Sequence, residues 1–176
     1  MIRLELITNE NITFATRIQN EIFPEYNGLN NYLDSLKNDS SIHFFLVYEG
    51  DICIGTTGIY AYKNDDKNAW IGFLGLKGKY RYQGIGKDVL ALTENYAREN
   101  NYKFIRLFTD KLNNDPVINF YKKNGYTFED YNSNLEEKKN DFLVVIGSKS
   151  LTGEKVEPWN NKFLNISKQA LKQIYD

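Results

Sequence analysis

The sequence has very little of several residue types on which other classes of protein depend. Among its 176 residues there are one cysteine, Cys53, one histidine, His43, and three prolines. A single cysteine forms no internal disulfide, and Cys53 lies in an apolar run, so we expect a core thiol in a reducing compartment. No group of His, Cys and carboxylate residues has the spacing of metal ligands, so no metal is expected.

Long apolar runs and a strong net charge are also missing. No stretch approaches the ~20 apolar residues of a membrane-spanning helix. The N-terminal segment, with Arg3 and Glu5, lacks the apolar region of a signal peptide. The formal net charge is −1, which provides no basic field for nucleic acid. We therefore expect a cytoplasmic protein that binds neither nucleic acid nor membrane.

The composition that remains is that of a folded domain. Hydrophobic residues make up 41% of the chain and charged residues 26%, which is ordinary for a globular protein and too apolar for a disordered one. A chain of this length is expected to form one domain with a substantial core.

The spacing of apolar residues predicts the order β-α-α-β-β-β-α-β-α-β-β. Strands are expected near residues 2–6, 42–48, 52–62, 70–76, 104–108, 126–131 and 142–148. The first helix should be capped by Asn9 or Asn11 and end at Pro24. Gly55 and Gly58 indicate a bulge or a close approach of two backbones.

The remaining helices are predicted from capping residues and from one-sided apolar spacing. The second helix should bury one face made of Leu29, Tyr32, Leu33 and Leu36. A later helix should have Asp115 as its N-cap, Pro116 in its first turn and Gly125 at its end. Beyond residue 150 an amphipathic tail continues from Trp159 to Tyr175 and should pack on the core or on a second subunit.

A basic loop with two glycines lies between the strand expected at 70–76 and the helix that follows it. The N–H groups at a helix N-terminus have no intrahelical partner, and the helix dipole places partial positive charge there. Gly84 and Gly86 allow a phosphate to approach those groups closely. Lys79, Arg81 and Lys87 add positive charge. The sequence therefore predicts a pyrophosphate-binding loop.

Two common nucleotide motifs are excluded by particular residues. A P-loop needs Ser or Thr after Gly-Lys, but Asp88 follows Lys87, and Arg81 stands where its first glycine belongs. A dinucleotide fingerprint needs a third glycine where the chain has Val89.

The loop instead fits a pattern that occurs with a second motif farther along the chain. Arg81-Tyr82-Gln83-Gly84-Ile85-Gly86 matches Arg/Gln-x-x-Gly-x-Gly/Ala, the acetyl-CoA loop of GNAT N-acetyltransferases. Asn114-x-x-Val117-x-x-x-Tyr121-x-x-x-Gly125-Tyr126 is similar to the second signature of that superfamily and lies in the expected order. The sequence therefore resembles the GNAT superfamily over residues 1–149.

This resemblance implies an α+β fold. The GNAT fold has a twisted, mostly antiparallel sheet of about seven strands with a V-shaped splay, flanked by about four helices. Residues 1–149 would form this domain. Residues 150–176 would be a helical extension that packs on the core or at the interface of a homodimer.

The resemblance also implies acetyl-CoA as co-substrate and a set of residues that bind it. Leu74, Gly75 and Leu76 would pair with pantetheine, and the Leu76 N–H would stabilise the oxyanion. Asn114 would bind the pantetheine arm, and Tyr121 would protonate the CoA thiolate as general acid. The pyrophosphate would lie on Arg81, Tyr82, Gln83, Gly84, Ile85, Gly86 and Lys87, mainly on the amides from Gln83 onward.

The implied reaction is direct attack of a neutral amine on acetyl-CoA. An amine near pKa 10 must first lose a proton, but residues 69–72, where many family members carry a glutamate, contain no carboxylate. The base is therefore left open among Glu21, Glu25, Asp65, His43 and a water chain. The acceptor would be a small-molecule amine or a protein amine, and acidic residues near the expected rim favour a cationic one.

Plainer interpretations stand beside these. Tyr121 could be a core aromatic residue, Asn114 a helix cap, and Arg81 only a source of positive charge. The missing carboxylate and the extra tail also suit a catalytically silent module that binds acyl-CoA or a protein partner.

Overall fold

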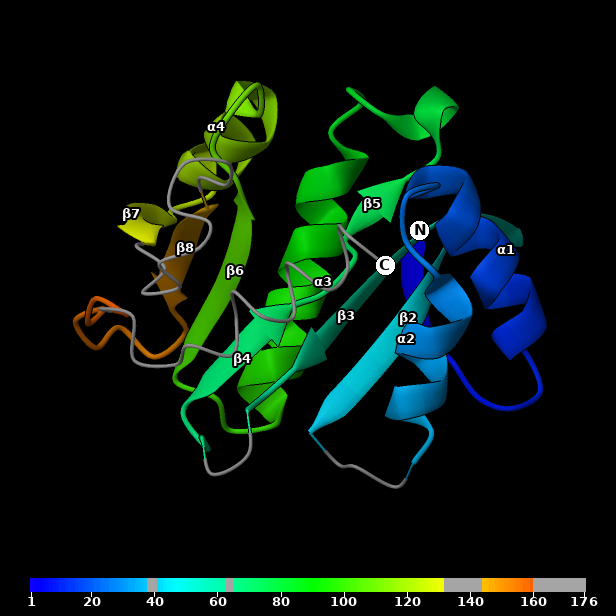
Figure 1. The fold of residues 1–176 in the computed structure, drawn as a ribbon, viewed down its shortest axis with the longest axis horizontal. Helices are drawn as coiled ribbons and strands as arrows, with labels where there is room; N and C mark the ends of the chain where they lie inside the picture. The colour runs from blue at the N-terminus through cyan, green and yellow to red at the C-terminus, as the bar shows by residue number, and fades with distance from the viewer. Residues whose placement is uncertain (38–40, 63–64, 132–143, 160–176) are drawn as a thin grey trace, which may run out of the picture. The chain divides into compact units, whose positions relative to one another are not determined.

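A computed structural model describes residues 1–37, 41–62, 65–131 and 144–159, which form two compact units divided between residues 103 and 104 (Figure 1). The described residues contain eight strands and four α-helices, and every described strand pair within a unit is antiparallel. This confirms the expected mixed α+β class. The strand count exceeds the expected seven because the strand predicted at 70–76 is divided in two.

The described residues of the first unit form five paired strands and three α-helices. Its strands lie in the order β1-β2-β3-β4, and β5 also pairs with β3. In chain order the elements are β1 (Ile2–Leu6), α1 (Ile12–Ile22), α2 (Gly28–Ser35), β2 (Ile42–Glu49), β3 (Ile52–Tyr60), β4 (Asn68–Ile71), β5 (Gly75–Leu76), the 3₁₀ turn η1 (Gly78–Tyr80) and α3 (Ile85–Glu99).

Helices cover both faces of these strands. Phe44 and Leu46 of β2 belong to a core cluster with Ile18 of α1 and Tyr32 of α2. Val47, which points to the opposite face, belongs with Val89 of α3 to a second cluster. The strands are therefore buried on both sides, and each side chain can be assigned to the α1/α2 face or to the α3 face.

The α2 prediction is only partly right. Tyr32 is fully buried and its ring packs edge-on against Phe44, with centroids 5.5 Å apart. Leu29 and Leu33, however, are 41% and 44% exposed. The two leucines lie one turn apart on a helix of eight residues, so they share a side of it that the sheet does not cover.

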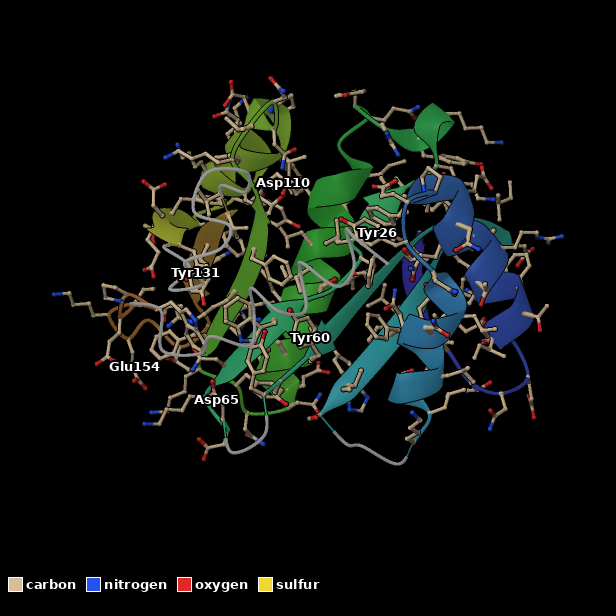
Figure 2. All side chains as sticks on the ribbon, in the orientation of Figure 1. Tyr26, Tyr60, Asp65, Asp110, Tyr131 and Glu154 are labelled. Atoms are coloured by element: carbon tan, nitrogen blue, oxygen red, sulfur yellow. The ribbon has the colours of Figure 1, made fainter. Side chains whose placement is uncertain are left out.

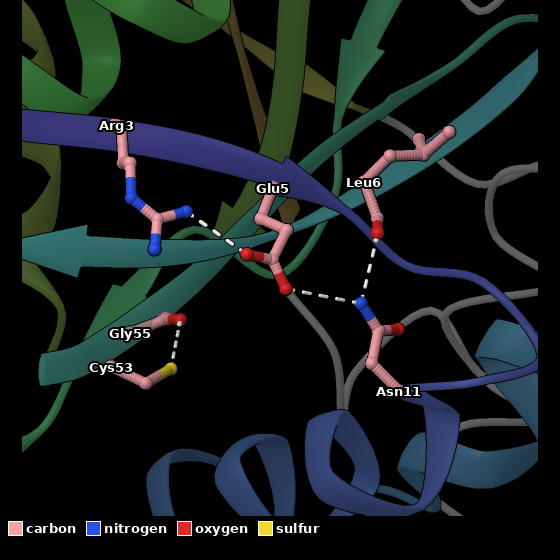
Figure 3. Close-up of polar contacts among 6 residues, drawn as sticks. All are labelled: Arg3, Glu5, Leu6, Asn11, Cys53 and Gly55. Carbon is pink, nitrogen blue, oxygen red and sulfur yellow. Dashed lines mark hydrogen bonds and ion pairs between the residues drawn. The ribbon is translucent and has the colours of Figure 1, made fainter. Parts of the chain in front are cut away.

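Asn11 occupies the N-cap position of α1, as one of the two predicted candidates, but its side chain does not cap the helix. Its Oδ1 accepts a hydrogen bond from the Thr8 N–H at 2.8 Å, and its Nδ2 donates to the Leu6 carbonyl at 3.0 Å and to Glu5 (Figure 3). Asn11 therefore fixes the turn between β1 and α1.

Both interpretations of the β3 glycines are confirmed. A bulge lies beside Gly55, because Val47 pairs with Gly55 while the next residue, Tyr48, pairs with Cys53. A Cβ at Gly55 would overlap the Gly75 carbonyl oxygen, and one at Gly58 would overlap the ring of Phe44.

The prediction of a single strand over residues 70–76 is wrong. Ile71 pairs with Ile59 and Gly75 pairs with Thr56, so three residues of one strand lie opposite two of β3. Phe73, inside this second bulge, has a φ of +50°, which is rare for a bulky side chain. The extra residue ends β4 at Ile71 and begins β5 at Gly75.

The second unit consists of β6 (Phe104–Asp110), α4 (Asp115–Lys123), β7 (Thr127–Tyr131) and β8 (Val144–Ser150). Strand β8 pairs with both β6 and β7. The turn predicted between the last two strands, and the predicted start of the last strand, lie outside the described residues.

The C-terminal end of α4 at Gly125 was predicted correctly. The predicted N-cap, Asp115, is one residue too late. The Asn114 carbonyl accepts from the N–H groups of Val117 and Ile118, both at 3.1 Å, so Asn114 and not Asp115 is the N-cap. At the C-terminus Tyr126 N–H donates to Tyr121 O and Gly125 N–H donates to Lys122 O, each at 3.1 Å. This Schellman motif needs the φ of +89° that Gly125 adopts.

The segment after β8 packs on the second unit as far as Trp159, which is buried. The Trp159 N–H donates to Glu129 Oε2 at 2.9 Å, and Arg106 donates to the Glu157 carbonyl at 3.0 Å. The Arg106 guanidinium also lies 5.1 Å from the centre of the Trp159 ring. The rest of the predicted amphipathic tail, residues 160–176, lies outside the described residues.

Candidate active site

The glycine loop is held in shape by its own polar side chains. Arg81 Nε donates to the Leu76 carbonyl at 2.8 Å, which ties the loop back to the end of β5. Gln83 Nε2 donates to the Lys79 carbonyl at 2.6 Å across the turn. Arg81 therefore makes a specific contact in addition to supplying positive charge.

The main chain of this loop presents a run of N–H groups at the N-terminus of α3. Tyr82 and Gly84 both adopt positive φ, +62° and +84°, and left-handed residues are a feature of the main-chain concavities that bind anions. The Lys87 N–H already donates to Gly84 O at 3.0 Å. Five further N–H groups, however, donate to no acceptor within the described residues: those of Tyr82, Gln83, Gly84, Ile85 and Gly86. Such a run of N–H groups is suited to an anion.

Strand β5 leads directly into this loop and presents one N–H away from β3. The Lys77 N–H donates to Ile54 O at 2.9 Å, and N–H groups alternate between the two edges of a strand. The Leu76 N–H therefore points to the edge opposite β3. The Leu76 carbonyl accepts from Arg81, and among the described residues no acceptor is found for the Leu76 N–H.

An aromatic cluster lies against the bulge that precedes β5. The Phe73 ring is 5.7 Å from Phe23 and 5.6 Å from Tyr26, both edge-on. Phe23 and Tyr26 come from the α1–α2 connection, and Tyr26 is labelled in Figure 2. All three residues are half-buried, and the Phe23 ring also lies against Gly75 of β5.

The carbonyl of Phe73 is held by a buried threonine. Thr56 Oγ1 donates to Phe73 O at 2.8 Å. Next to it is the buried Tyr32 hydroxyl, whose pKa is raised well above its usual value by burial and lowered to a smaller extent by Thr56. This contact between Thr56 and Phe73 is not evident from residue types, because the positive φ of Phe73 leaves no mark on the sequence.

The two expected site residues of the second motif lie in the second unit. Tyr121 on α4 is 6% exposed, and its ring packs edge-on against Phe120 and Tyr126 at 5.1 Å. Asn114 Nδ2 donates to Thr109 Oγ1 at 2.6 Å and to Asp110 O at 3.1 Å. Burial raises the pKa of the Asp110 carboxyl (Figure 2).

Three of the four candidate bases are engaged elsewhere. Glu21 pairs with Lys77 at 3.4 Å, Asp65 accepts main-chain hydrogen bonds from Lys67 and Asn68, and His43 Nδ1 lies 3.0 Å from the Tyr96 hydroxyl. Glu25 is exposed.

Cys53 is unsuited to nucleophilic attack. Its thiol is buried and points to the Gly55 carbonyl at 3.8 Å (Figure 3). Burial raises the pKa of the Cys53 thiol, which keeps it protonated at neutral pH.

The described part of the chain shows neither a metal-binding cluster nor a membrane-spanning helix. There, no three His, Cys, Asp or Glu side chains gather where they could hold a metal ion. None of the helices described has the length and apolar character needed to cross a bilayer.

The order of elements, with a run of main-chain N–H groups between β5 and α3 that have no acceptor among the described residues, is that of an acetyltransferase fold. The chain belongs to the GNAT family of acetyltransferases, whose sequence profile matches residues 7–126. Family membership supports acetyl transfer from acetyl-CoA as its general activity. A comparison with curated proteins gives no match.

Many solved structures share the fold. A GNAT-family acetyltransferase from Desulfovibrio desulfuricans has a TM-score of 0.71 and 12% identity, with 86% of this chain and 99% of that chain covered. A GNAT acetyltransferase from Elizabethkingia anophelis with acetyl-CoA bound has a TM-score of 0.66 and 16% identity, covering 85% and 97%. Naa50 of Arabidopsis thaliana, in complex with the bisubstrate analogue CoA-Ac-MVNAL, has a TM-score of 0.66 and 24% identity, covering 85% and 98%.

Proposed function

We propose that this protein transfers the acetyl group of acetyl-CoA to a primary amine by direct attack. The observation that carries the proposal is the run of N–H groups from Tyr82 to Gly86, which lies after β5 and η1 and has no acceptor among the described residues. A pyrophosphate on these groups would place the rest of CoA next to a strand edge that has a free N–H at Leu76.

Each implied residue then has one task. Loop residues 81–87 hold the pyrophosphate, Leu74 to Leu76 pair with pantetheine, and the Leu76 N–H stabilises the oxyanion. The amine nitrogen attacks the carbonyl carbon, the C–S bond breaks, and Tyr121 gives its proton to the CoA thiolate. Asn114 binds the pantetheine arm. The amine proton leaves through water or Glu25, because the other candidate carboxylates are engaged.

The acceptor class that we favour is a peptide amine beside an apolar side chain. Support comes from the half-buried rings of Phe23, Tyr26 and Phe73 next to β5. Proteins of similar fold include Naa50 with a peptide-containing analogue, the ribosomal-protein-S18-alanine N-acetyltransferase of Escherichia coli, and a spermidine N-acetyltransferase chimera from Vibrio cholerae and hSSAT. Peptides and polyamines therefore both belong in an acceptor screen.

The test combines calorimetry with kinetics. The protein should bind acetyl-CoA, and Tyr121→Phe should lower kcat by up to about 10²-fold while the KM for acetyl-CoA stays nearly constant. The matched control is Tyr131→Phe, which removes a hydroxyl from another buried tyrosine of the same unit and should leave kcat unchanged.

Two results would count against the proposal. Absence of acetyl-CoA binding would exclude it altogether. Tight CoA binding with no turnover of any peptide, polyamine or amino-acid amine would favour a silent acyl-CoA-binding module, which the lack of a carboxylate at residues 69–72 also suits.

A further inference from the structure

Thr56 and Thr57 are adjacent buried threonines whose hydroxyls do different things. Thr56 is 1% exposed and Thr57 is fully buried. Thr57 Oγ1 lies 2.9 Å from Thr93 Oγ1 and so links β3 to α3. Thr56 points to the α1/α2 face and donates to the Phe73 carbonyl at 2.8 Å. Only Thr56 therefore acts on the bulge before β5.

The bulge decides which face each following side chain occupies. Phe73 and Gly75 lie toward the α1/α2 face, where a Cβ on Gly75 would meet Ile22 and Phe23. Leu74 and Leu76 lie toward α3 in the cluster that contains Val89. In a regular strand Phe73, two residues after Ile71, would share the face of Ile71. The extra residue moves Phe73 to the other face and sets the register of β5.

Phe73 stays in this conformation against an energetic cost. A bulky residue at positive φ is disfavoured and persists only where its surroundings hold it. The rings of Phe23 and Tyr26 hold the side chain. Within the described residues, Thr56 is the one residue whose side chain donates a hydrogen bond to the Phe73 carbonyl.

We propose that Thr56 is a positioning residue for acetyl transfer: through the Phe73 carbonyl it fixes the bulge, and thereby the direction in which the Leu76 N–H meets the thioester oxygen. The inference rests on the proposed function. It assigns to Thr56 no contact with either substrate. Its effect should therefore appear in recognition of the thioester carbonyl and not in binding of the rest of CoA.

A ligand pair isolates this effect without any turnover. Acetyl-CoA and S-ethyl-CoA have the same CoA portion and nearly the same shape at sulfur, but only acetyl-CoA has the carbonyl oxygen. A net hydrogen bond to that oxygen would make the native protein bind acetyl-CoA roughly 3- to 10-fold more tightly than S-ethyl-CoA. Calorimetry of both ligands gives this ratio for each variant.

Thr56→Val should bring the ratio close to one while the Kd for S-ethyl-CoA changes less than about 2-fold, and Thr56→Ser should restore the ratio. Thr57→Val is the matched control and should keep the native ratio, because the Thr93 hydroxyl still donates to Val89 O. Thr56→Ala removes the hydroxyl without adding volume and replaces the valine variant if that variant melts below the assay temperature.

The outcomes separate the two hypotheses. A native protein that binds neither ligand overturns the proposed function. A native protein that binds both ligands equally overturns the Thr56 inference and leaves CoA binding intact. The inference is also overturned if Thr56→Val keeps the native preference for acetyl-CoA over S-ethyl-CoA, or if Thr57→Val loses that preference to the same extent. The Thr56 hydroxyl would then have no special role.

Discussion

Asn114 is a residue whose side chain is oriented before any ligand binds. Both hydrogens of its amide nitrogen are used, one on Thr109 Oγ1 and one on Asp110 O. Its Oδ1 is thus the group left for a ligand, so Asn114 can accept a hydrogen bond but has no N–H to offer. The amide N–H groups of pantetheine are donors of the required kind.

We predict that Asn114→Ala weakens acetyl-CoA binding by about 3- to 10-fold, the value of one net hydrogen bond. Helix α4 should keep its stability, because the Asn114 side chain makes no capping bond. Isothermal calorimetry and thermal melting measure the two effects.

The control for this change is Asn119→Ala, an exposed asparagine of the same helix, which should affect neither binding nor melting. A drop in melting temperature for Asn114→Ala without weaker binding would instead identify Asn114 as a purely structural residue.

At the scale of elements, the bulge between β4 and β5 rests on a glycine that has no room for a side chain. A Cβ on Gly75 would lie 2.6 Å from Ile22 Cγ2 and 2.6 Å from the Phe23 ring. The C-terminal turn of α1 therefore supports the strand edge that carries the Leu76 N–H. The α1–α2 connection and the CoA strand are coupled through this contact.

Gly75→Ala should accordingly destabilise the fold by about 1–3 kcal/mol through overpacking and lower activity more than the stability loss explains. The comparison is Gly78→Ala, three residues along, where a Cβ has open space and φ is not positive. Denaturant unfolding and kcat/KM measure both variants. Equal behaviour of the two would show that the contact with α1 does not position the strand.

The sequence predicted those elements whose signal is local. Capping residues and glycines placed the end of α4 and the β3 bulge, and the two motifs identified the family. The interruption of the 70–76 strand was missed, since the residues that contact the bulge are distant in the chain: Thr56, 17 residues earlier, donates to the Phe73 carbonyl. The exposed leucines of α2 were missed for a similar reason: helical spacing shows which residues share a face, and packing decides whether it is covered.

At the scale of the whole chain, the second unit is completed by residues that follow the last strand. Trp159 is 1% exposed and is held through its main chain by Glu129 and through its ring by Arg106. Arg106 is itself buried and donates to Ser148 Oγ at 2.7 Å. The segment up to Trp159 is therefore part of the folded unit.

Trp159→Ala should cost about 3–5 kcal/mol of unfolding free energy, as expected for removing a buried aromatic side chain. Lys155→Ala, at an exposed site of the same segment, should change stability by less than about 0.5 kcal/mol. Chemical denaturation monitored by circular dichroism gives both values, and a loss below about 1 kcal/mol for Trp159→Ala would mean that the ring is dispensable to the unit.

Near β5 the donor is proposed to be bound by main-chain groups and the acceptor by side chains, so point mutations should affect the two substrates differently. The groups proposed to hold the donor are main-chain N–H groups, which every residue except proline supplies, and residues 70–99 contain no proline. The groups proposed to meet the acceptor are the side chains of Phe23, Tyr26 and Phe73, which any point mutation can alter. A library randomised at these three positions should therefore change acceptor preference more than affinity for the pyrophosphate end of CoA, so these side chains would be a starting point for redirecting acetyl transfer to new amines.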